Sequence, residues 1–256
     1  MARVLVTGSA DGIGRETAAQ LIALGHEVVG HARNESRADD LRAALPGIGP
    51  VVTGELASLA GTTALAEAAV KAGGYDVVIH NAGISGRPAR HLTVDGMEQI
   101  FQVNVVAPYL LTALLPRPAR LVYLTSGLES DGVVDLDDMQ FARKPWHGMR
   151  AYSDSKMYDV VLAFAVARRW PEVITNVVDP GWIKTRLGGP GATDELPEGA
   201  ETQVWLATSD DPEAVRTGRY LKRRRVLEPN PAAREHAIQD ALLAECERLT
   251  GVALPT

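Results

Sequence analysis

The stretch Val4-Leu5-Val6-Thr7-Gly8-Ser9-Ala10-Asp11-Gly12-Ile13-Gly14 decides the fold of this chain. It opens with a short aliphatic and β-branched run that ends at a glycine, which is typical of a buried strand. A helical pattern follows from Arg15 to Leu24, and residues 26–31 form a second apolar run. A strand, a glycine-rich turn, a helix and another strand within about 30 residues make a βαβ unit, whose crossover requires parallel strands.

The same alternation continues to the end of the chain. We expect further strands at 49–53, 76–80, 120–125, 174–178 and 218–221, and helices at 37–44, 62–71, 94–115, 152–168, 199–209 and 232–250. This order predicts an α/β fold, a single Rossmann-type domain over residues 1–256 with a doubly wound parallel β-sheet flanked by helices. Residues 215–256 are expected to form a C-terminal extension on the same core.

The amino-acid composition limits which binding partners and which cellular compartment are expected. The formal net charge of −6 argues against binding to nucleic acid or to an anionic membrane surface. The single cysteine, Cys246, cannot form an internal disulfide or a cysteine metal cluster, and we expect it in the core. No apolar run approaches the ~20 residues that span a bilayer, and the first strand leaves no room for a signal peptide. We therefore expect a cytoplasmic protein with no membrane partner.

The three glycines of the opening stretch indicate a phosphate site. Gly8, Gly12 and Gly14 let the backbone turn tightly and approach a phosphate, which the N-terminus of the next helix then holds. Between the first strand and first helix of an α/β chain, such a loop predicts a bound dinucleotide.

The stretch Tyr152-Ser153-Asp154-Ser155-Lys156 carries the candidate chemistry. Tyr152 and Lys156 are four residues apart, so a helix places them on one face. A nearby ammonium favours phenolate and lowers the tyrosine pKa from its ordinary ~10. Such a tyrosine can exchange a proton with a carbonyl or alcohol oxygen. Alone, this spacing is more often chance, but beside a dinucleotide loop it predicts an acid/base centre.

The spacing Gly-x-x-x-Gly-x-Gly followed by Tyr-x-x-x-Lys resembles the short-chain dehydrogenase/reductase family. The resemblance continues in four further segments, which are His80-Asn81-Ala82-Gly83, Asn104 within residues 101–105, Thr125-Ser126-Gly127, and Pro180-Gly181-Trp182-Ile183-Lys184-Thr185. His80 stands where the family has a first Asn.

The resemblance implies a catalytic role for four residues. Tyr152 would protonate the carbonyl oxygen while hydride arrives from the nicotinamide, and Ser126 would bind the same oxygen. Lys156 would support the tyrosine and hold the nicotinamide ribose. Asn104 would bind the backbone or a water that relays protons to Lys156.

The resemblance also implies a cofactor-binding set and no metal. Its members are Gly8, Ser9, Asp11, Gly12, Ile13, Gly14, Arg33, Asn34, Glu55, Leu56, Asn81, Ala82, Gly83, Tyr152, Lys156, Pro180, Gly181, Ile183 and Thr185.

The end of the second strand favours NADP over NAD. NAD-preferring members usually carry an acid there for the ribose hydroxyls, whereas this chain has Arg33 where a 2′-phosphate would lie. Arg37 could assist. Asp11 in the glycine loop counts for NAD, unless it caps the helix that begins at Gly12.

The region before Tyr152 suggests a branch of the family. Ser126 precedes Tyr152 by 26 residues, and the intervening residues 132–139, together with the C-terminal tail, resemble the retinol dehydrogenase and WW-domain oxidoreductase branch. We expect residues 185–200 to form a lid over the substrate, with Trp182, Trp146 and Leu128 lining the pocket.

Two charged segments are interpreted as exposed surface. The carboxylates of Asp135, Asp137 and Asp138 resemble a solvated face more than a metal site, and residues 222–225 (Lys-Arg-Arg-Arg) are expected to be solvent-exposed.

We therefore expect an NADP(H)-dependent oxidoreductase acting on a carbonyl or alcohol of a small apolar molecule. The alternatives are an NAD(H)-dependent member, a non-catalytic dinucleotide sensor and a nucleotide-sugar epimerase. A homo-oligomer through helices 94–115 and 152–168 fits the family, unless the insertion before Tyr152 blocks that contact.

Overall fold

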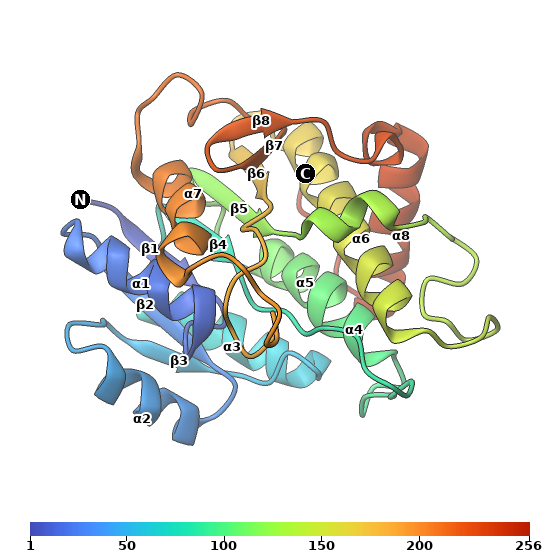
Figure 1. The fold of residues 1–256 in the computed structure, drawn as a ribbon, viewed down its shortest axis with the longest axis horizontal. Coiled ribbons are helices and arrows are strands. Elements are labelled where there is room, and N and C mark those ends of the chain that lie inside the picture. Colours follow the sequence, from blue (N-terminus) through green and yellow to red (C-terminus); the bar gives the residue numbers. More distant parts are fainter.

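An eight-stranded sheet forms the centre of the computed structural model, which describes all 256 residues (Figure 1). The strand order is β3-β2-β1-β4-β5-β6-β7-β8; the first seven strands run parallel and β8 is antiparallel to β7. The strands are β1 Arg3–Val6, β2 Glu27–Ala32, β3 Val51–Thr53, β4 Val77–His80, β5 Arg120–Leu124, β6 Ile174–Val178, β7 Arg219–Lys222 and β8 Arg225–Leu227. The predicted fold class is confirmed.

Helices cover both faces of this sheet. They are α1 Gly12–Ala23, α2 Glu35–Ala44, α3 Leu59–Ala72, α4 Gln99–Phe101, α5 Ala107–Leu114, α6 Gly148–Arg169, α7 Leu196–Thr208 and α8 His236–Thr250. A π-helical segment at Gln102–Val106 joins α4 to α5, and single 3₁₀ turns occur at Gly127–Asp131 and Pro231–Arg234.

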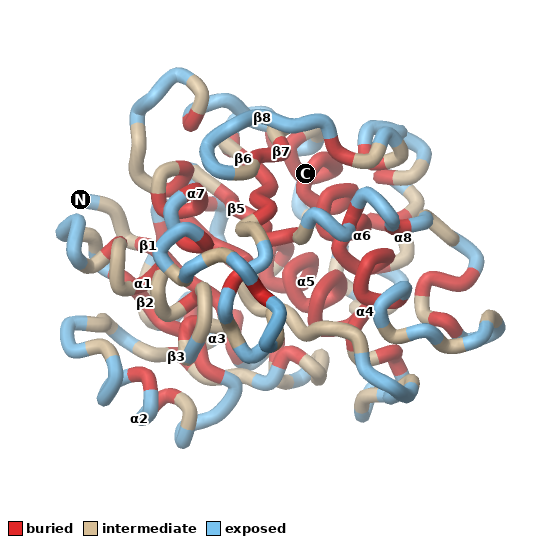
Figure 2. Tube along the Cα trace, viewed as in Figure 1, coloured by how far each residue is buried: buried red, intermediate tan, exposed pale blue.

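Successive side chains of β1 point to opposite faces of the sheet and pack into two separate hydrophobic clusters. Leu5 packs into a cluster of 39 buried residues shared with α3, α5 and α6. Val4 and Val6 pack into a smaller cluster on the opposite face with residues of α1 and α7. Residues 151–167 of α6 are all buried, so this helix lies inside the molecule (Figure 2).

Short polar side chains fix where several helices begin. Asn34 accepts a hydrogen bond from the N–H of Arg37 at the start of α2, and Ser58 accepts one from Gly61 at the start of α3. Both are N-cap arrangements that satisfy amide groups the helix leaves free. Gly73, with φ of 121°, ends α3.

Three predicted elements differ from the structure. The helix expected over 232–250 is divided into the 3₁₀ turn Pro231–Arg234 and α8, which begins at His236. The helix expected over 94–115 begins at Gln99, because Glu98 turns its carboxylate onto the N–H groups of Ile100 and Phe101 and caps the helix there. The strand expected at 218–221 continues into a hairpin with β8. The turn of that hairpin is made by Arg223 and Arg224, both at positive φ (49° and 58°).

The C-terminal residues pack on the main core. Leu242 and Cys246 of α8 are fully buried in the cluster that contains α6. The Tyr109 hydroxyl donates to the carbonyl of Val252, and the Trp170 indole N–H donates to that of Pro255, both over 2.8 Å. These bonds bind the tail across α5 and the end of α6. None of the helices combines the length and the apolar character needed to cross a bilayer.

Candidate active site

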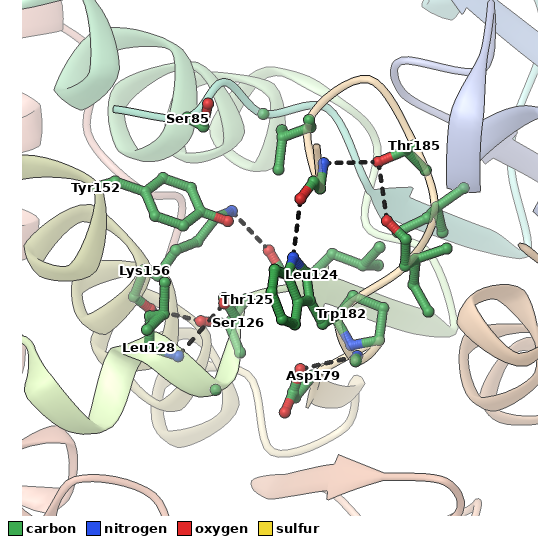
Figure 3. Close-up of a pocket in the computed structure, with 18 of the residues that line it drawn as sticks. Ser85, Leu124, Thr125, Ser126, Leu128, Tyr152, Lys156, Asp179, Trp182 and Thr185 are labelled. Atoms are coloured by element: carbon green, nitrogen blue, oxygen red, sulfur yellow. Dashed lines mark hydrogen bonds between the residues drawn. The ribbon is translucent and has the colours of Figure 1, made fainter. Parts of the chain in front are cut away.

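A cavity of about 610 Å³ lies at the carboxyl ends of the central strands (Figure 3). Its walls come from separate elements, namely Ile13 of α1, residues 124–128 after β5, Tyr152 and Lys156 of α6, and residues 179–183 after β6. In parallel α/β sheets, ligands bind at this edge, where the strand order reverses.

Tyr152 and Lys156 lie together in the first half of α6. Both are buried, and the Lys156 ammonium lies 6.0 Å from the centroid of the Tyr152 ring. Its Nζ donates to the carbonyl of Leu124 at 3.0 Å and to Oδ2 of Asp159 at 2.7 Å. Burial acts to lower the pKa of Lys156, but the charges of Asp159 and Tyr152 outweigh it and raise that pKa. A buried positive charge therefore stands beside the phenol.

Ser126 lies on the same side of the cavity as Tyr152 and Lys156, whereas Trp182 and Thr185 lie on the other side in Figure 3. Ser126 is the N-cap of the 3₁₀ turn that follows β5, and its Oγ accepts a hydrogen bond from the N–H of Leu128 at 3.3 Å. The hydroxyl proton remains free to be donated to a ligand oxygen.

Asn104 does not line the cavity but holds the loop that does. Its Oδ1 accepts from the N–H of Ile84, and its Nδ2 donates to the carbonyl of Ile84 and to Oγ of Ser155. Asn104 lies inside the π-helical segment, where the N–H of Ala107 bonds to the carbonyl of Gln102. The side chain thus ties the chain after β4 to α6 through the backbone of Ile84 and the hydroxyl of Ser155; binding the backbone was one of the two roles expected for it.

The glycine loop is a tight turn that leaves no room for side chains at Gly8 and Gly14. A Cβ on Gly14 would lie 2.4 Å from the carbonyl oxygen of Gly8 and from Nδ2 of Asn81, and Gly8 and Gly12 have φ of 65° and 54°. Asn81 Nδ2 donates to the carbonyl of Thr7 at 2.8 Å and so fixes the loop. The close packing requires glycine at these positions.

Asp11 does not cap α1, so the capping interpretation is wrong. Its side chain makes no hydrogen bond to the helix N-terminus and instead lies 2.7 Å from Nη2 of Arg37. The first N–H groups of α1 are therefore free of any side-chain cap, as a phosphate site requires.

The residues predicted for the adenosine end lie beyond the cavity, at the ends of β2 and β3. Arg33 is exposed and makes no ion pair, whereas Arg37 is held by Asp11 and Asp40. Glu55 accepts from the N–H of Ala57, and Leu56 is buried. Asn34 is occupied in capping α2. Arg33 is the free cation at this place.

His31 is a residue that the sequence reasoning passed over. Its Nδ1 accepts a hydrogen bond from the N–H of Gly8 at 3.0 Å, and its Nε2 lies 2.9 Å from the carbonyl of Gly54. This pattern assigns the Nε2–H tautomer. Burial lowers the pKa of His31. A histidine in β2, where buried strands usually carry an apolar residue, could have indicated from the sequence that this position has a special role.

The Pro180–Thr185 segment forms the wall opposite Tyr152. Pro180, Gly181, Ile183 and Thr185 all line the cavity. Thr185 Oγ1 accepts from the N–H of Gly188, and the Trp182 indole N–H donates to the carbonyl of Gly188 at 2.8 Å. Residues 185–195 therefore fold back on Trp182, and the end of the expected lid, 196–200, belongs to α7.

Lys222 also lines the cavity and was missed. Its Nζ lies 2.8 Å from Oδ2 of Asp179, whose side chain is 3% exposed. The basic run 222–225 was expected to be solvent-exposed, and Arg223, Arg224 and Arg225 are exposed; in addition Arg223 pairs with Asp194 and Arg224 with Glu201. Local sequence carries no sign of these pairs, because the partners are far apart along the chain.

Two further expectations are wrong. Trp146 lies outside the cavity wall; it packs edge-on against Phe141 and donates to the carbonyl of Arg87. Asp138 is buried rather than solvated, and accepts from the N–H groups of Ala142, Arg143 and Lys144. It organises the loop before α6. No three His, Cys, Asp or Glu side chains lie close enough together to hold a metal ion.

Comparison with known proteins agrees with this geometry. A family model described as short chain dehydrogenase matches residues 2–195. The short-chain dehydrogenase chyC of Penicillium rubens is 38% identical over 258 residues, which cover all of both chains. Retinol dehydrogenase 14 of Homo sapiens is 31% identical over 97% of this chain and 86% of its own. A crystal structure of an uncharacterized protein from Mycobacterium paratuberculosis has a TM-score of 0.87 at 26% identity, covering 100% of this chain and 96% of that one.

The fold and the residues around the cavity define an oxidoreductase of the Rossmann type. The chain belongs to the short-chain dehydrogenase family, whose members bind NAD or NADP. The match to retinol dehydrogenase 14 confirms the predicted resemblance to that branch.

Proposed function

We propose that the chain transfers hydride between NADP(H) and the carbonyl or alcohol carbon of a small apolar molecule, with Tyr152 as general acid and base. The observation that carries this proposal is the shared cavity: Tyr152, Lys156 and Ser126 line one side of it, and Trp182 and Thr185 line the other. A reacting carbonyl between these walls meets both the proton donor and the face where a nicotinamide would lie.

The residues of the glycine loop fit a dinucleotide. The loop is so tightly packed that a Cβ at Gly14 would clash with the carbonyl oxygen of Gly8 and Nδ2 of Asn81, and the N-terminus of α1 that it leads to has no side-chain cap. Gly8, Gly12 and Ile13 would hold the pyrophosphate, and residues 180–185 the nicotinamide. When bound, the nicotinamide supplies or accepts the hydride.

The protein's own contribution is proton transfer and orientation. In the reducing direction, the Tyr152 hydroxyl donates its proton to the carbonyl oxygen as that oxygen gains negative charge. Ser126 donates a hydrogen bond to the same oxygen, which holds it within reach of the tyrosine. The Lys156 ammonium stabilises the phenolate that remains. Asn104 keeps the loop at Ile84 in place against α6.

Arg33 supports NADP over NAD. It is the exposed cation without a carboxylate partner at the end of β2, where a 2′-phosphate would lie. Arg37, by contrast, already pairs with Asp11 and Asp40, so its charge is compensated.

Exposed apolar side chains around the cavity support an apolar substrate. Leu128, Met149, Trp182 and Leu187 line it and are each more than a third exposed. They come from three separate segments, because Trp182 and Leu187 share the loop between β6 and α7, yet they gather at one opening. Large exposed apolar groups that cluster in this way mark binding surfaces.

The test is oxidation of NADPH, followed at 340 nm, by purified protein with a panel of ketones, aldehydes and quinones of increasing apolar size. We expect turnover with apolar members of the panel and a higher kcat/KM with NADPH than with NADH. Equal or better use of NADH would overturn the NADP assignment. The absence of turnover with every carbonyl, despite measurable NADPH binding, would favour the non-catalytic sensor.

A further inference from the structure

A second buried charge accompanies Lys156. Asp159, one turn further along α6, places Oδ2 2.7 Å from the Lys156 ammonium, and the two side chains are only 4% and 7% exposed. Asp159 is not one of the four residues, Asn104, Ser126, Tyr152 and Lys156, for which the family resemblance implies a catalytic role. An ion pair this deeply buried requires close contact and additional hydrogen bonds, because both charges lose their hydration.

The contacts of Lys156 leave little freedom to its ammonium group. An ammonium has three N–H donors, of which one bonds to Asp159 and a second to the carbonyl of Leu124 at 3.0 Å. One donor therefore remains for the side of Tyr152 and of a nicotinamide ribose. Lysine has a long, flexible side chain, and Asp159 removes most of the freedom of its end.

Asp159 also changes the charge that Tyr152 meets. While the carboxylate is ionised, the pair has no net charge, so the attraction between Lys156 and a phenolate is partly compensated. Burial raises the pKa of Asp159 to about 6, against the opposing effect of Lys156. The pair is therefore neutral above this pH and gains a positive charge below it.

Neighbouring titratable groups do not change charge in the same range. Tyr123 of β5 lies close enough for the charge of Asp159 to raise its pKa further, beyond the effect of burial. His80 of β4, stacked on Tyr123 with ring centroids 4.6 Å apart, has its pKa lowered by burial to about 3. Both stay neutral from pH 5 to pH 9, so neither of them alters the charge around Asp159 in the range where Asp159 itself changes charge.

We infer that Asp159 is a positioning residue for the catalytic centre, holding the Lys156 ammonium through a buried ion pair and setting how strongly that ammonium stabilises the Tyr152 phenolate. The inference rests on the proposed roles of Tyr152 and Lys156. It adds an acid to the four residues for which the family resemblance implies a catalytic role.

The test follows tyrosinate absorbance at 295 nm in the purified apoprotein as pH is raised. Burial raises the pKa of five of the six tyrosines, which are Tyr75, Tyr109, Tyr123, Tyr158 and Tyr220. The first tyrosinate signal should therefore disappear in Tyr152→Phe. In Asp159→Asn, which removes the compensating charge, we expect the midpoint of this signal to fall by about one pH unit or more.

Asp154→Asn is the matched control. Asp154 is equally buried on the same helix, but it accepts from the N–H of Val133 and pairs with Arg150 instead of Lys156. We expect it to leave the midpoint within a few tenths of a pH unit. An unchanged midpoint in Asp159→Asn, or an equal shift in Asp154→Asn, would overturn the inference.

A measurement on protein with Asp159 intact covers the case in which Asp159→Asn does not fold. In protein labelled with ¹³C-aspartate, the Asp159 carboxyl should titrate above the ordinary range for aspartate, and its midpoint should move upward in Lys156→Met. A carboxyl that titrates at the ordinary value, or ignores that substitution, contradicts the inference. None of these titrations needs a substrate or cofactor, so failure of the inference is distinguishable from failure of the proposed reaction.

Discussion

The imidazole Nδ1 of His31 accepts a hydrogen bond from the backbone N–H of Gly8 over 3.0 Å. The other ring nitrogen contacts the carbonyl of Gly54, so one buried side chain connects the glycine loop after β1 with the turn after β3. These two loops flank the predicted path of the cofactor from pyrophosphate to adenine.

His31→Phe should weaken NADPH binding roughly tenfold. The phenyl ring preserves much of the volume but leaves the Gly8 N–H without its acceptor, at a cost of about 1–3 kcal/mol. Fluorescence titration of NADPH measures the Kd. His26→Phe is the control, because His26 lies at the opposite end of β2 and accepts only from the N–H of Ala2. Equal affinity in His31→Phe and the wild type would show that this connection does not shape the site.

Arg33→Ala should change cofactor preference. Loss of an arginine contact to a phosphate costs about 1.5–3 kcal/mol, so kcat/KM with NADPH should fall roughly 10–100-fold while that with NADH stays unchanged. Arg42→Ala controls for general charge, since Arg42 is exposed on α2 and pairs with Asp39. A loss shared equally between the two cofactors would place the 2′-phosphate elsewhere.

The positions of most elements follow from local sequence, because strand and helix periodicity and glycine turns are local properties. The glycine loop, Tyr152 and Lys156 could therefore be recognised without coordinates. The pairing of Lys222 with Asp179 could not, because it depends on the parallel pairing of β6 with β7, which brings together residues from distant parts of the chain. Trp146 was misplaced for a similar reason: its loop is set by the buried Asp138, whose partners are backbone N–H groups.

Asn104 shows an intermediate case. An asparagine within an apolar helical run was a signal for a special role, since its helix propensity is poor. The sequence pattern could not reveal that the helix widens into a π-helical segment at this point. Nor could it reveal that the Asn104 amide hydrogen-bonds to both the N–H and the carbonyl of Ile84.

Tyr152→Phe should lose nearly all turnover while it retains affinity for NADPH. The phenyl ring fills the same space but carries no proton, and loss of a general acid typically costs about 10²–10⁴-fold. Tyr109→Phe is the control for removal of a tyrosine hydroxyl, because that hydroxyl bonds only to the tail carbonyl of Val252. Substantial residual rate in Tyr152→Phe would mean that another group donates the proton. Parallel loss of NADPH affinity would instead indicate a structural defect.

The protein should be a monomer of 27.4 kDa in light scattering. Subunits of this family commonly pair through the helices that correspond to α5 and α6, but here residues 107–113 and 151–167 are already buried within one chain. Leu242 of α8 is part of that cover. Leu242→Asp should loosen α8, expose apolar surface and raise the apparent mass, whereas Ala244→Asp on the exposed side should not. A wild-type dimer would show that pairing uses another face.

His80 should make the fold sensitive to acid. It is buried, with Nδ1 lacking a partner and Nε2 3.0 Å from the Thr112 hydroxyl, and burial lowers its pKa from 6.5 to about 3. The pKa of His80 is lower in the folded state than in the unfolded state. The free energy of unfolding is therefore undiminished by this group above about pH 6.5 and decreases as the pH falls from 6.5 towards 3. Between these pH values His80 is protonated in the unfolded state and neutral in the folded state.

His80→Asn should therefore flatten the pH dependence of stability. Each pH unit below 6.5 costs the wild type about 1.4 kcal/mol through this group, so between pH 7 and pH 4.5 the variant should lose roughly 2–3 kcal/mol less. Urea unfolding at both pH values measures the free energy of unfolding of the wild type and of the variant. The pH-dependent loss is compared between the two proteins, so a packing defect that is the same at both pH values cancels. The exposed His236→Asn is the control. A loss in His80→Asn as large as that of the wild type would show that His80 accepts a proton in the folded state, with Nδ1 then reaching a partner.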